Sequence, residues 1–312
     1  MSSCKVVLAS QIAQTYAEEI GQGLAQLNRK PLLVGILANS DEAAKMYAKW
    51  TEKTCTEMGF AYELREVAKE DLEEKILAAN TEDQVDGILV YFPVFGGAQD
   101  RYMQQCIAQE KDCEGLSNIY IRNLYRNIRY LDDNQTQKSI LPCTPLACVK
   151  VLEYLKVYNT VIPYGNRLYG KTITIVNRSE IVGRPLAALL ANDGAIVYSV
   201  DISGVEKYTR GEGLRLVQHH VTDVDMTMEQ AAKISDVIIT GVPSPEFKFP
   251  VAWIKPGAVC VNFSSEKNFS PEVKTQASLY VPMMGKVTIM MLLRNLLRLC
   301  ENKRSATGAT VE

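Results

Sequence analysis

Hydrophobic positions in the first half of the chain alternate between short continuous runs and segments with helical periodicity. The continuous apolar runs at residues 31–38 and 86–94 are typical of strands buried on both faces, and residues 61–67 alternate like a strand. Helical patterns separate these strands, one ending at about Met58 and another covering residues 71–80. This β-α-β-α-β order predicts a parallel sheet with right-handed crossovers.

The second half of the chain starts a new series after an apolar-periodic helix that begins near Pro145. Five strand-like runs follow it, at residues 171–176, 195–200, 235–240, 258–263 and 278–282. Residues 203–233 have no clean period and are interpreted as an insertion, and a last apolar helix covers residues 287–300. We therefore predict an α/β fold with two α/β domains, the second a Rossmann-like, doubly wound parallel sheet.

Composition and charge exclude several classes of protein. The 312 residues are 47% hydrophobic and 22% charged, which describes a globular protein rather than a fibrous, repeat or disordered one. The net charge is 34 − 36 = −2, so the chain has no basic excess for nucleic-acid binding. The stretch 287–300 contains two arginines and is too short to span a membrane, and the N-terminal residues lack a signal-peptide core. We expect a cytoplasmic protein.

The cysteine and histidine content argues against several kinds of catalytic and metal site. Eight scattered cysteines contain no C-x-x-C pair, which favours reduced thiols over disulfides or a zinc site. His219 and His220 are the two histidines, and we expect them on a solvated loop because their surroundings are polar. We therefore predict no histidine triad and no metal site. The basic and aromatic stretch 120–130 suggests either RNA binding or a surface or dimer contact, and the small net charge favours the second.

Residues 171–201 have the pattern of a strand, a tight turn and a helix that bind a dinucleotide. Pro185 lies where the helix begins, Gly183 lets the backbone approach a ligand, and the helix N-terminus offers free N–H groups to a pyrophosphate. The next strand ends at Asp201, which lies 201 − 177 = 24 residues after Asn177. A carboxylate at this tip accepts hydrogen bonds from ribose hydroxyls and repels a 2′-phosphate, which predicts NAD rather than NADP.

Two alternatives stay open for this turn. The usual G-x-G-x-x-G pattern is absent, so the segment is alternatively a β-α-β unit with a Gly/Pro turn that binds nothing. Arg178 in the same turn could meet either a 2′-phosphate or the pyrophosphate. We give Asp201 the greater weight, because its repulsion of a 2′-phosphate would have to be overcome.

Several blocks of the sequence carry a family resemblance. They are KDCEG (111–115), LPCTP (141–145), NRSEIVGRPLAALL (177–190), SDVIITGVPSPEF (235–247), WIKPGAVCVNF (253–263) and KVTIMMLLRN (286–295). In this order they resemble the methylenetetrahydrofolate dehydrogenase/cyclohydrolase family over residues 30–300, and the chain is most similar to its monofunctional NAD-dependent members. The resemblance implies two α/β domains with a folate cleft between them, a homodimer, and a role in one-carbon metabolism.

The resemblance also implies domain roles and site residues. Residues 1–145 with the C-terminal helix 287–312 would bind the folate, and residues 146–286 would bind NAD. The implied cofactor-binding residues are Asn177, Arg178, Ser179, Val182, Gly183, Asp201, Ile202, Gly241, Val242 and Pro243. The implied substrate-binding residues are Tyr47, Thr51, Tyr91, Glu114, Pro282 and Gly285. Tyr47 and Cys143 are implied to be catalytic.

The chain departs from the family pattern on the helix after the first strand. Family members carry Tyr-x-x-x-Lys there, and the lysine is essential for the cyclohydrolase step. Here Tyr47 is present, but Thr51 stands at the lysine position. Lys49 and Lys53 lie two positions from Thr51, hence about 200° around a helix from it. Tyr91 stands where the family has a glutamine that supports the lysine.

The dehydrogenase step does not need that lysine. Two nitrogens beside the methylene carbon stabilise the cation left when hydride departs, so the reaction needs placement rather than a strong base. Hydrolysis must activate water and therefore needs a titratable group. The resemblance implies NAD-dependent oxidation of 5,10-methylenetetrahydrofolate to 5,10-methenyltetrahydrofolate, and we expect no appreciable cyclohydrolase activity. The alternatives are a bifunctional enzyme with a repositioned lysine and a non-catalytic sensor that binds NAD or folate.

Two positions of the implied folate site differ in how they can be interpreted. Glu114 stands where the family has an aspartate that binds the pterin, so the carboxylate is kept on a longer arm. Cys143 either contacts the substrate or is a buried structural cysteine. The family's glycine-rich loop before the last helix is shorter here, at residues 281–287.

Overall fold

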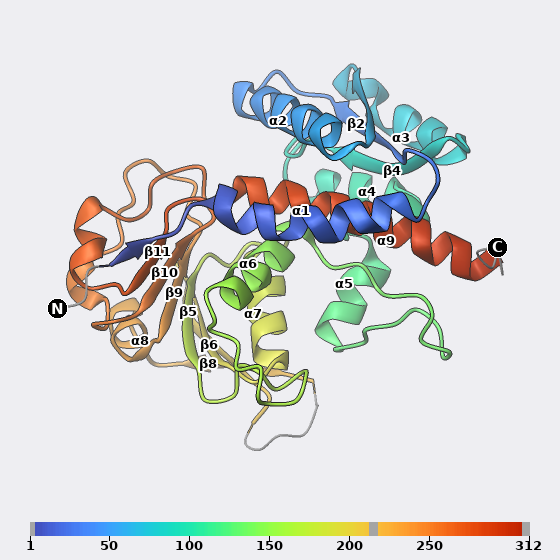
Figure 1. Cartoon of the computed structure of the whole chain (residues 1–312). Helices are drawn as coiled ribbons and strands as arrows, with labels where there is room; N and C mark the ends of the chain where they lie inside the picture. The colour runs from blue at the N-terminus through green and yellow to red at the C-terminus, as the bar shows by residue number, and fades with distance from the viewer. Residues whose placement is uncertain (1–3, 212–217, 308–312) are drawn as a thin grey trace. The chain divides into compact units, whose positions relative to one another are not determined.

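The computed structural model describes residues 4–211 and 218–307 and divides into two compact units (Figure 1). The large-sheet unit comprises residues 1–13, 124–127 and 144–288. The small-sheet unit comprises residues 14–123, 128–143 and 289–312. Each unit is described by itself below.

The large-sheet unit is built on strands in the order β1-β11-β10-β9-β5-β6-β7-β8. Its strands are β1 (Lys5–Val6), β5 (Thr172–Val176), β6 (Ile196–Asp201), β7 (Gly204–Thr209), β8 (His220–Val224), β9 (Val237–Thr240), β10 (Val259–Asn262) and β11 (Leu279–Val281). The strands from β1 to β6 in this order are parallel, whereas β7 and β8 pair antiparallel. The five strand-like runs of the second half are confirmed as β5, β6, β9, β10 and β11.

The helices of this unit produce the predicted double winding. They are α6 (Cys143–Tyr154, in this unit from residue 144), α7 (Gly183–Asn192) and α8 (Met228–Ile234). β6 and β9 flank β5 on opposite sides, and α7 and α8 lead into them. Right-handed crossovers therefore place α7 and α8 on opposite faces of the sheet, as a Rossmann-like fold requires.

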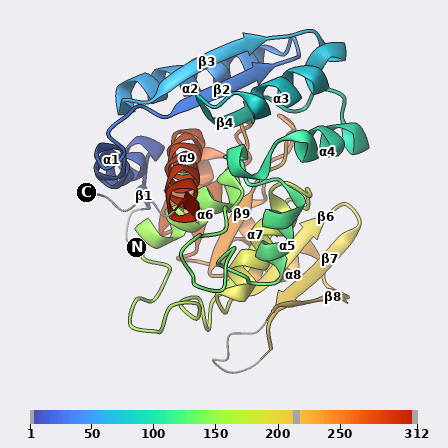
Figure 2. The ribbon, with the colours of Figure 1, turned by 90° about the vertical axis from the view of Figure 1, so that its right-hand side faces the viewer.

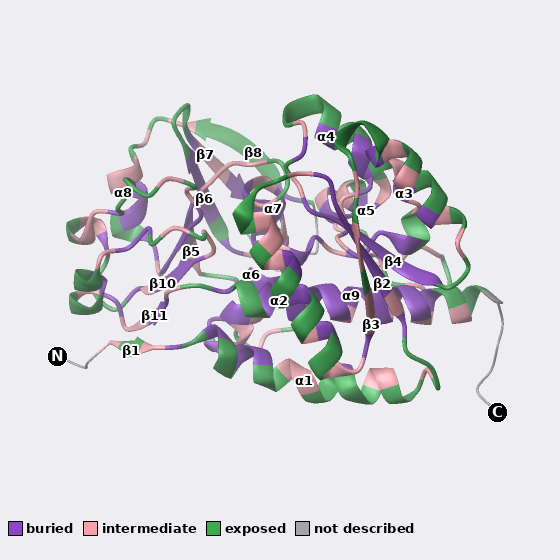
Figure 3. Cartoon of the chain, turned by 90° about the horizontal axis from the view of Figure 1, so that it is seen from above, coloured by how far each residue is buried: buried purple, intermediate pink, exposed green. Residues whose placement is uncertain are grey.

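Residues 203–233, which lack a clean period and were interpreted as an insertion, form regular secondary structure. The segment forms β7 and β8, which continue the sheet beyond β6, and then α8 (Figure 2). Residues 212–217 of the segment lie outside the described residues. The period is missing because β8 is the edge strand and is mostly exposed (Figure 3), so it needs no alternation of apolar side chains.

The first residues of the chain also join the large sheet. Lys5 and Val6 form β1, which pairs in parallel with Leu279 and Tyr280 of β11. The sequence analysis had placed these residues in the folate domain. Backbone pairing, which has no sequence signature in a two-residue strand, decides their place instead.

The small-sheet unit has three parallel strands in the order β3-β2-β4. They are β2 (Leu32–Leu37), β3 (Ala61–Glu66) and β4 (Val85–Val90). Every residue of β4 is buried, and its Ile88 and Val90 pack with Val34 and Ile36 of β2 in one apolar core. These strands confirm the parallel sheet predicted from the apolar runs of the first half.

Three helices of the small-sheet unit follow predicted segments, namely α2 (Glu42–Met58), α3 (Leu72–Thr81) and α9 (Gly285–Thr307). The sequence analysis did not predict α1 (Ala9–Ala25), α4 (Gly97–Cys106) or α5 (Asn118–Tyr125). Of these helices, α1, α5 and α9 contribute residues to both units. The Asp41 side chain caps α2 by accepting a hydrogen bond from the Ala43 N–H, and Gly59 ends it at φ 86°. In the described part of the chain, no helix is both long and apolar enough to cross a membrane.

Candidate functional site

In the small-sheet unit, α2 carries two of the predicted site residues one turn apart. Thr51 is fully buried, and its hydroxyl donates to the Tyr47 carbonyl at 2.9 Å. The Tyr47 ring meets the Tyr91 ring edge-on, with centroids 6.1 Å apart and an interplanar angle of 77°. Tyr91 follows β4 directly and is 4% exposed. The fold therefore brings together Tyr47, Thr51 and Tyr91, which lie up to 44 positions apart in the sequence.

Tyr62 completes this group, although the sequence analysis missed it. Its hydroxyl lies 2.7 Å from the Tyr91 hydroxyl, and it comes from β3. Gly35 on the central strand β2 makes room for the pair, because a Cβ there would lie 2.4 Å from the Tyr62 hydroxyl. Burial raises the pKa of Tyr62 to about 12 and raises the pKa of Tyr91 as well. Both hydroxyls are therefore neutral at physiological pH.

The two lysines near Thr51 lie on the outer side of α2. Lys49 and Lys53 are exposed, while Thr51 is buried. The Lys53 ammonium lies 3.7 Å from the Glu57 carboxylate, which is also exposed. The helical spacing argument is thus confirmed: neither lysine shares the buried face of Thr51.

A buried carboxyl group lies in the same unit. Burial and, to a smaller extent, the charge of Asp112 together raise the pKa of Glu114 to about 8. The Oε2 atom of Glu114 is buried and has no hydrogen-bond partner. The side chain is therefore protonated at neutral pH and can donate a hydrogen bond, which an ionised carboxylate cannot do.

Cys143 lies beside Glu114, since its backbone N–H donates to the Glu114 carbonyl at 3.3 Å. The Cys143 thiol donates to the Cys113 carbonyl at 3.2 Å. Asn295 of α9 donates to the same carbonyl at 2.9 Å and to the Leu141 carbonyl at 2.8 Å. Burial raises the pKa of the Cys143 thiol well above its usual range. The thiol is protonated and part of a packed polar cluster, so its catalytic role stays a prediction.

In the large-sheet unit, the predicted dinucleotide turn is held by its own hydrogen bonds. The Asn177 amide donates to the Gly241 carbonyl at 2.8 Å, and its Oδ1 accepts from the Ser179 N–H and hydroxyl. A Cβ on Gly183 would lie 2.2 Å from the Asn177 carbonyl oxygen. Gly183 is therefore required because the turn approaches the start of α7 closely, whether or not a ligand also approaches this glycine.

Gly241, Val242 and Pro243 follow β9, on the same edge of the sheet as this turn. A Cβ on Gly241 would lie 1.9 Å from the Phe263 ring, so packing also requires this glycine. The Val242 N–H donates to the Asn268 side chain at 2.8 Å. The segment is a fixed part of the carboxyl edge of the parallel strands, where doubly wound folds bind ligands.

Asp201 ends β6 and is exposed, as the sequence predicts for a residue that contacts a ribose. Its Oδ1 accepts from the Ile202 N–H at 2.7 Å, and the Ile202 side chain is fully exposed. Between the two strands, the first N–H groups of α7 are already partnered: the Gly183 N–H donates to the Ser179 hydroxyl at 3.3 Å, and the Arg184 N–H donates to the Ser179 carbonyl at 3.0 Å. The exposed carboxylate at the strand tip fits a ribose, whereas the predicted free N–H groups at the start of α7 are not found at these two residues.

Two predicted substrate residues belong to the large-sheet unit, apart from the other four. The Pro282 carbonyl accepts from the Asn262 side chain at 3.0 Å. Gly285 is the first residue of α9, and the space around a Cβ there is open. The folate contacts of both residues stay predictions.

The expectation for the two histidines is wrong for one of them. His219 is 7% exposed, stacks on the Tyr208 ring at 5.6 Å and shares its Nδ1 with the Asn192 side chain at 3.1 Å. Burial lowers its pKa to about 4. His220 begins β8 and is exposed. Within the described ranges, no group of three or more His, Cys, Asp or Glu side chains is arranged to hold a metal ion.

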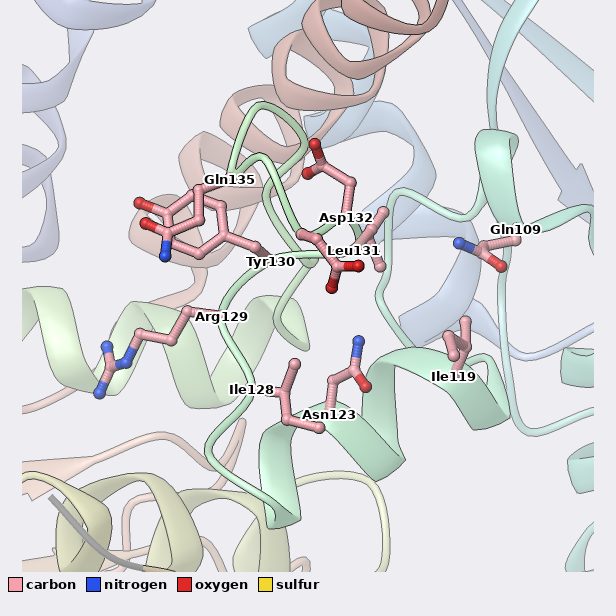
Figure 4. A pocket seen from close by; sticks show the side chains of 10 residues that line it. Gln109, Ile119, Asn123, Ile128, Arg129, Tyr130, Leu131, Asp132 and Gln135 are labelled. Atoms are coloured by element: carbon pink, nitrogen blue, oxygen red, sulfur yellow. The ribbon is translucent and has the colours of Figure 1, made fainter.

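A separate polar cavity of 590 Å³ lies in the small-sheet unit (Figure 4). It is lined by α5 and by the loop 128–135, which includes the basic and aromatic stretch noted in the sequence. Tyr120 of that stretch is buried and donates to the Gln109 carbonyl at 3.0 Å, so part of the stretch is structural. None of the predicted site residues lines this cavity.

Comparisons with known proteins show the family of the chain. The catalytic-domain model of the tetrahydrofolate dehydrogenase/cyclohydrolase family matches residues 7–114, and its NAD(P)-binding-domain model matches residues 142–304. The methylenetetrahydrofolate dehydrogenase [NAD(+)] of Schizosaccharomyces pombe is 62% identical over 298 residues, which cover 95% of this chain and 93% of that protein. The protein of the same name from Saccharomyces cerevisiae is 59% identical, with 96% of both chains covered.

A solved structure is similar over nearly the whole chain. It is the NAD-dependent 5,10-methylenetetrahydrofolate dehydrogenase from Saccharomyces cerevisiae, with a TM-score of 0.93 and 57% identity, covering 98% of this chain and 99% of that one. The bifunctional FolD enzyme from Campylobacter jejuni has a TM-score of 0.76 at 23% identity. The second likeness extends to the fold alone.

Proposed function

This chain belongs to the tetrahydrofolate dehydrogenase/cyclohydrolase family, and we propose that it oxidises 5,10-methylenetetrahydrofolate to 5,10-methenyltetrahydrofolate with NAD as the hydride acceptor. The observation that carries this proposal is the identity of 62% and 59% to two proteins named as NAD-dependent methylenetetrahydrofolate dehydrogenases. When bound, the nicotinamide ring supplies the site that accepts a hydride. The chain itself supplies binding and orientation.

The residues of the small-sheet unit support placement of a substrate rather than proton transfer. Tyr47 offers a partly buried ring and hydroxyl, and Tyr91 holds that ring edge-on. Glu114 is protonated at neutral pH and can donate a hydrogen bond to an acceptor of the substrate. Hydride departure needs no base, because the flanking nitrogens of the folate stabilise the cation.

We further propose that cyclohydrolase activity is not appreciable. The place of the family's lysine is taken by Thr51, whose hydroxyl is committed to the Tyr47 carbonyl. The place of its supporting glutamine is taken by Tyr91, whose hydroxyl pairs with that of Tyr62. These hydroxyls are neutral at physiological pH and cannot act as the base that water activation needs. The exposed positions of Lys49 and Lys53 weigh against the alternative of a repositioned lysine.

Dehydrogenase and cyclohydrolase assays on one purified preparation test the proposal. We expect NADH formation from methylenetetrahydrofolate, weaker activity with NADP, and hydrolysis of methenyltetrahydrofolate at the rate of buffer alone. Binding of NAD or folate without turnover would instead support the sensor alternative. Hydrolysis well above the buffer rate would support the bifunctional one.

We also propose that the enzyme is a cytoplasmic homodimer whose product enters purine biosynthesis. The family resemblance supports the dimer, and eight free cysteines are compatible with a reducing compartment. Light scattering should give twice the mass of the chain, and a fluorescent fusion should be diffuse in the cytoplasm. Loss of the gene together with other sources of one-carbon units should create a purine requirement.

A further inference from the structure

The two terminal nitrogens of Arg178, in the dinucleotide turn, are held by neighbouring groups of the same unit. One terminal nitrogen donates to the carbonyls of Ser199 and Gly204, each at 2.7 Å. The other donates to the Ser203 hydroxyl at 2.9 Å and lies 3.3 Å from the Glu206 carboxylate. The two terminal nitrogens of a guanidinium carry four N–H groups. Three of them donate in these hydrogen bonds and the ion pair with Glu206 lies on the same side chain, whereas the Nε of Arg178 is buried without a partner.

The side chain is also removed from solvent. The Arg178 side chain is 6% exposed and that of Glu206 is 13% exposed, so the ion pair is largely buried. A buried pair is screened much less than a surface pair, and removing either partner leaves an uncompensated charge. Glu206 therefore matters more to Arg178 than an exposed carboxylate would.

Glu206 is itself fixed from its other side. Arg184 at the start of α7 contacts both carboxylate oxygens at 3.3 Å, and the Tyr208 hydroxyl donates to Oε2 at 3.0 Å. Glu206 thus lies on β7 between an arginine of the turn and an arginine of the helix. It belongs to the segment that the sequence analysis interpreted as an insertion and to which it gave no role.

We propose that Glu206 is the positioning residue that excludes NADP, because it pairs with Arg178 and turns this arginine away from a 2′-phosphate. This inference rests on the proposed NAD-dependent function and adds a second determinant to Asp201. A doubly wound fold that binds NADP uses an arginine near the tip of the second strand for the 2′-phosphate. Here such an arginine is present, but its terminal nitrogens donate to the β6–β7 turn and its charge is paired with that of Glu206.

The local charges lead to the same conclusion. Arg178 and Arg184 carry two positive charges, and Glu206 together with Glu180, which lies 3.1 Å from Arg184, carries two negative charges. Asp201 adds a third negative charge. A 2′-phosphate would therefore approach a group with a net charge of −1, while the terminal nitrogens of Arg178 are held by the β6–β7 turn and Glu206.

The test is the substitution Glu206→Gln in the full-length enzyme. We expect kcat/KM for NADP to rise by about tenfold or more, the effect of gaining one charged hydrogen bond. We expect kcat/KM for NAD to change by less than about threefold, because ribose hydroxyls do not need Arg178. Calorimetric titration with adenosine 2′,5′-bisphosphate should show a matching gain in affinity, independently of turnover.

Three further variants make the result specific. Asp223→Asn is the matched control, because Asp223 lies opposite Glu206 on β8, is exposed, and should leave the NADP/NAD ratio unchanged. Arg178→Ala combined with Glu206→Gln should lose the gain, since the freed arginine is its source. Tyr208→Phe removes one hydrogen bond from the Glu206 carboxylate and keeps its charge, so it should shift the ratio in the same direction by less. This milder variant tests the inference even where Glu206→Gln fails to fold.

An unchanged NADP/NAD ratio in folded Glu206→Gln, or in Tyr208→Phe where Glu206→Gln does not fold, would overturn the inference. A gain that persists without Arg178 would overturn it as well. NADH formation by the unmodified enzyme distinguishes a wrong inference about Glu206 from a wrong proposed function. If the unmodified enzyme forms no NADH, the proposed function itself is wrong.

Discussion

At the scale of single residues, the buried hydroxyl pair of Tyr62 and Tyr91 is open to a direct energetic test. Tyr91→Phe leaves the Tyr62 hydroxyl without its partner at 2.7 Å, and we expect a loss of about 1–3 kcal/mol in the free energy of unfolding. Tyr62→Phe with Tyr91→Phe removes both hydroxyls and should cost less than the sum of the single changes. Urea denaturation of the four proteins gives the coupling. Additive losses would show that the two hydroxyls do not depend on each other.

Glu114 predicts a particular dependence of stability on pH. Its pKa is raised from 4.5 to about 8 in the folded chain, so the folded state keeps a proton that the unfolded state loses between these values. Its contribution is fully present below pH 4.5 and is lost as the pH rises to about 8, by up to about 1.4 kcal/mol per pH unit.

The measurement compares the unmodified chain with Glu114→Gln, which cannot ionise. Urea denaturation at several pH values should show the variant gaining stability relative to the unmodified chain from pH 5 to pH 8, with no further gain above about pH 8. A constant difference across this range would contradict the assignment of the raised pKa.

Some residues around Tyr91 could be predicted from the sequence, and others could not. Thr51 and Tyr91 were identifiable because they depart from a family pattern at known positions. Tyr62 was not, because its partner is 29 residues away and the two meet only across the central strand, beside Gly35. Its signal was a tyrosine on a half-buried strand, which by itself is ordinary packing.

At the scale of elements, α9 buries several polar side chains among its apolar ones, and Asn295 is the one that contacts the Glu114 and Cys143 region. Asn295 is 4% exposed and donates to the carbonyls of Cys113 and Leu141, so it fixes both loops of the Glu114 and Cys143 region. Asn295→Leu leaves these carbonyls without that donor, and we expect a loss of about 1–3 kcal/mol for each. Leu293→Met on the same helix removes no polar partner and should cost less than about 1.5 kcal/mol.

Thermal or urea unfolding of both variants checks this prediction, and the dehydrogenase assay adds a functional readout. Asn295→Leu should also raise KM for the folate, since it loosens the loop that carries Glu114. Equal stability of the two variants would mean that water or relaxation satisfies the carbonyls. The sequence signal for Asn295 was an asparagine within the apolar stretch 287–300, which marks a buried polar contact but not its partner.

The β7–β8 hairpin is the element that the sequence pattern described least well. Glu206 and Tyr208 lie two positions apart on β7 and therefore on the same face of the strand. Glu206 contacts Arg178 and Arg184, and Tyr208 packs on His219. β8 is exposed at the edge of the sheet and carries no apolar pattern. An edge hairpin with charged contacts on one side has no hydrophobic period to detect, although it holds the ion pair that we connect with cofactor choice.

At the scale of the whole molecule, both α/β units contain buried parallel strands that are covered by helices. The continuous apolar runs identified most of these strands, because a strand covered on both faces must be apolar on both. The boundaries of the units were harder to predict from the sequence. Residues 1–13 belong to the large-sheet unit, which they join through β1, and residues 124–127 belong to the same unit. Both depend on pairing and packing between segments far apart in the chain.

The sequence by itself determined the α/β class, the positions of the main strands along the chain and the family. It also determined that Thr51 stands where the family has a lysine. These follow from local periodicity and from residue identities at recognisable positions, which need no knowledge of distant contacts. Only the tertiary structure decided that Tyr62 joins Tyr91, that Glu114 is protonated at neutral pH, that His219 is buried, and that Glu206 holds Arg178. Each of these depends on the distance between side chains that are separated along the chain, and on the loss of water around them.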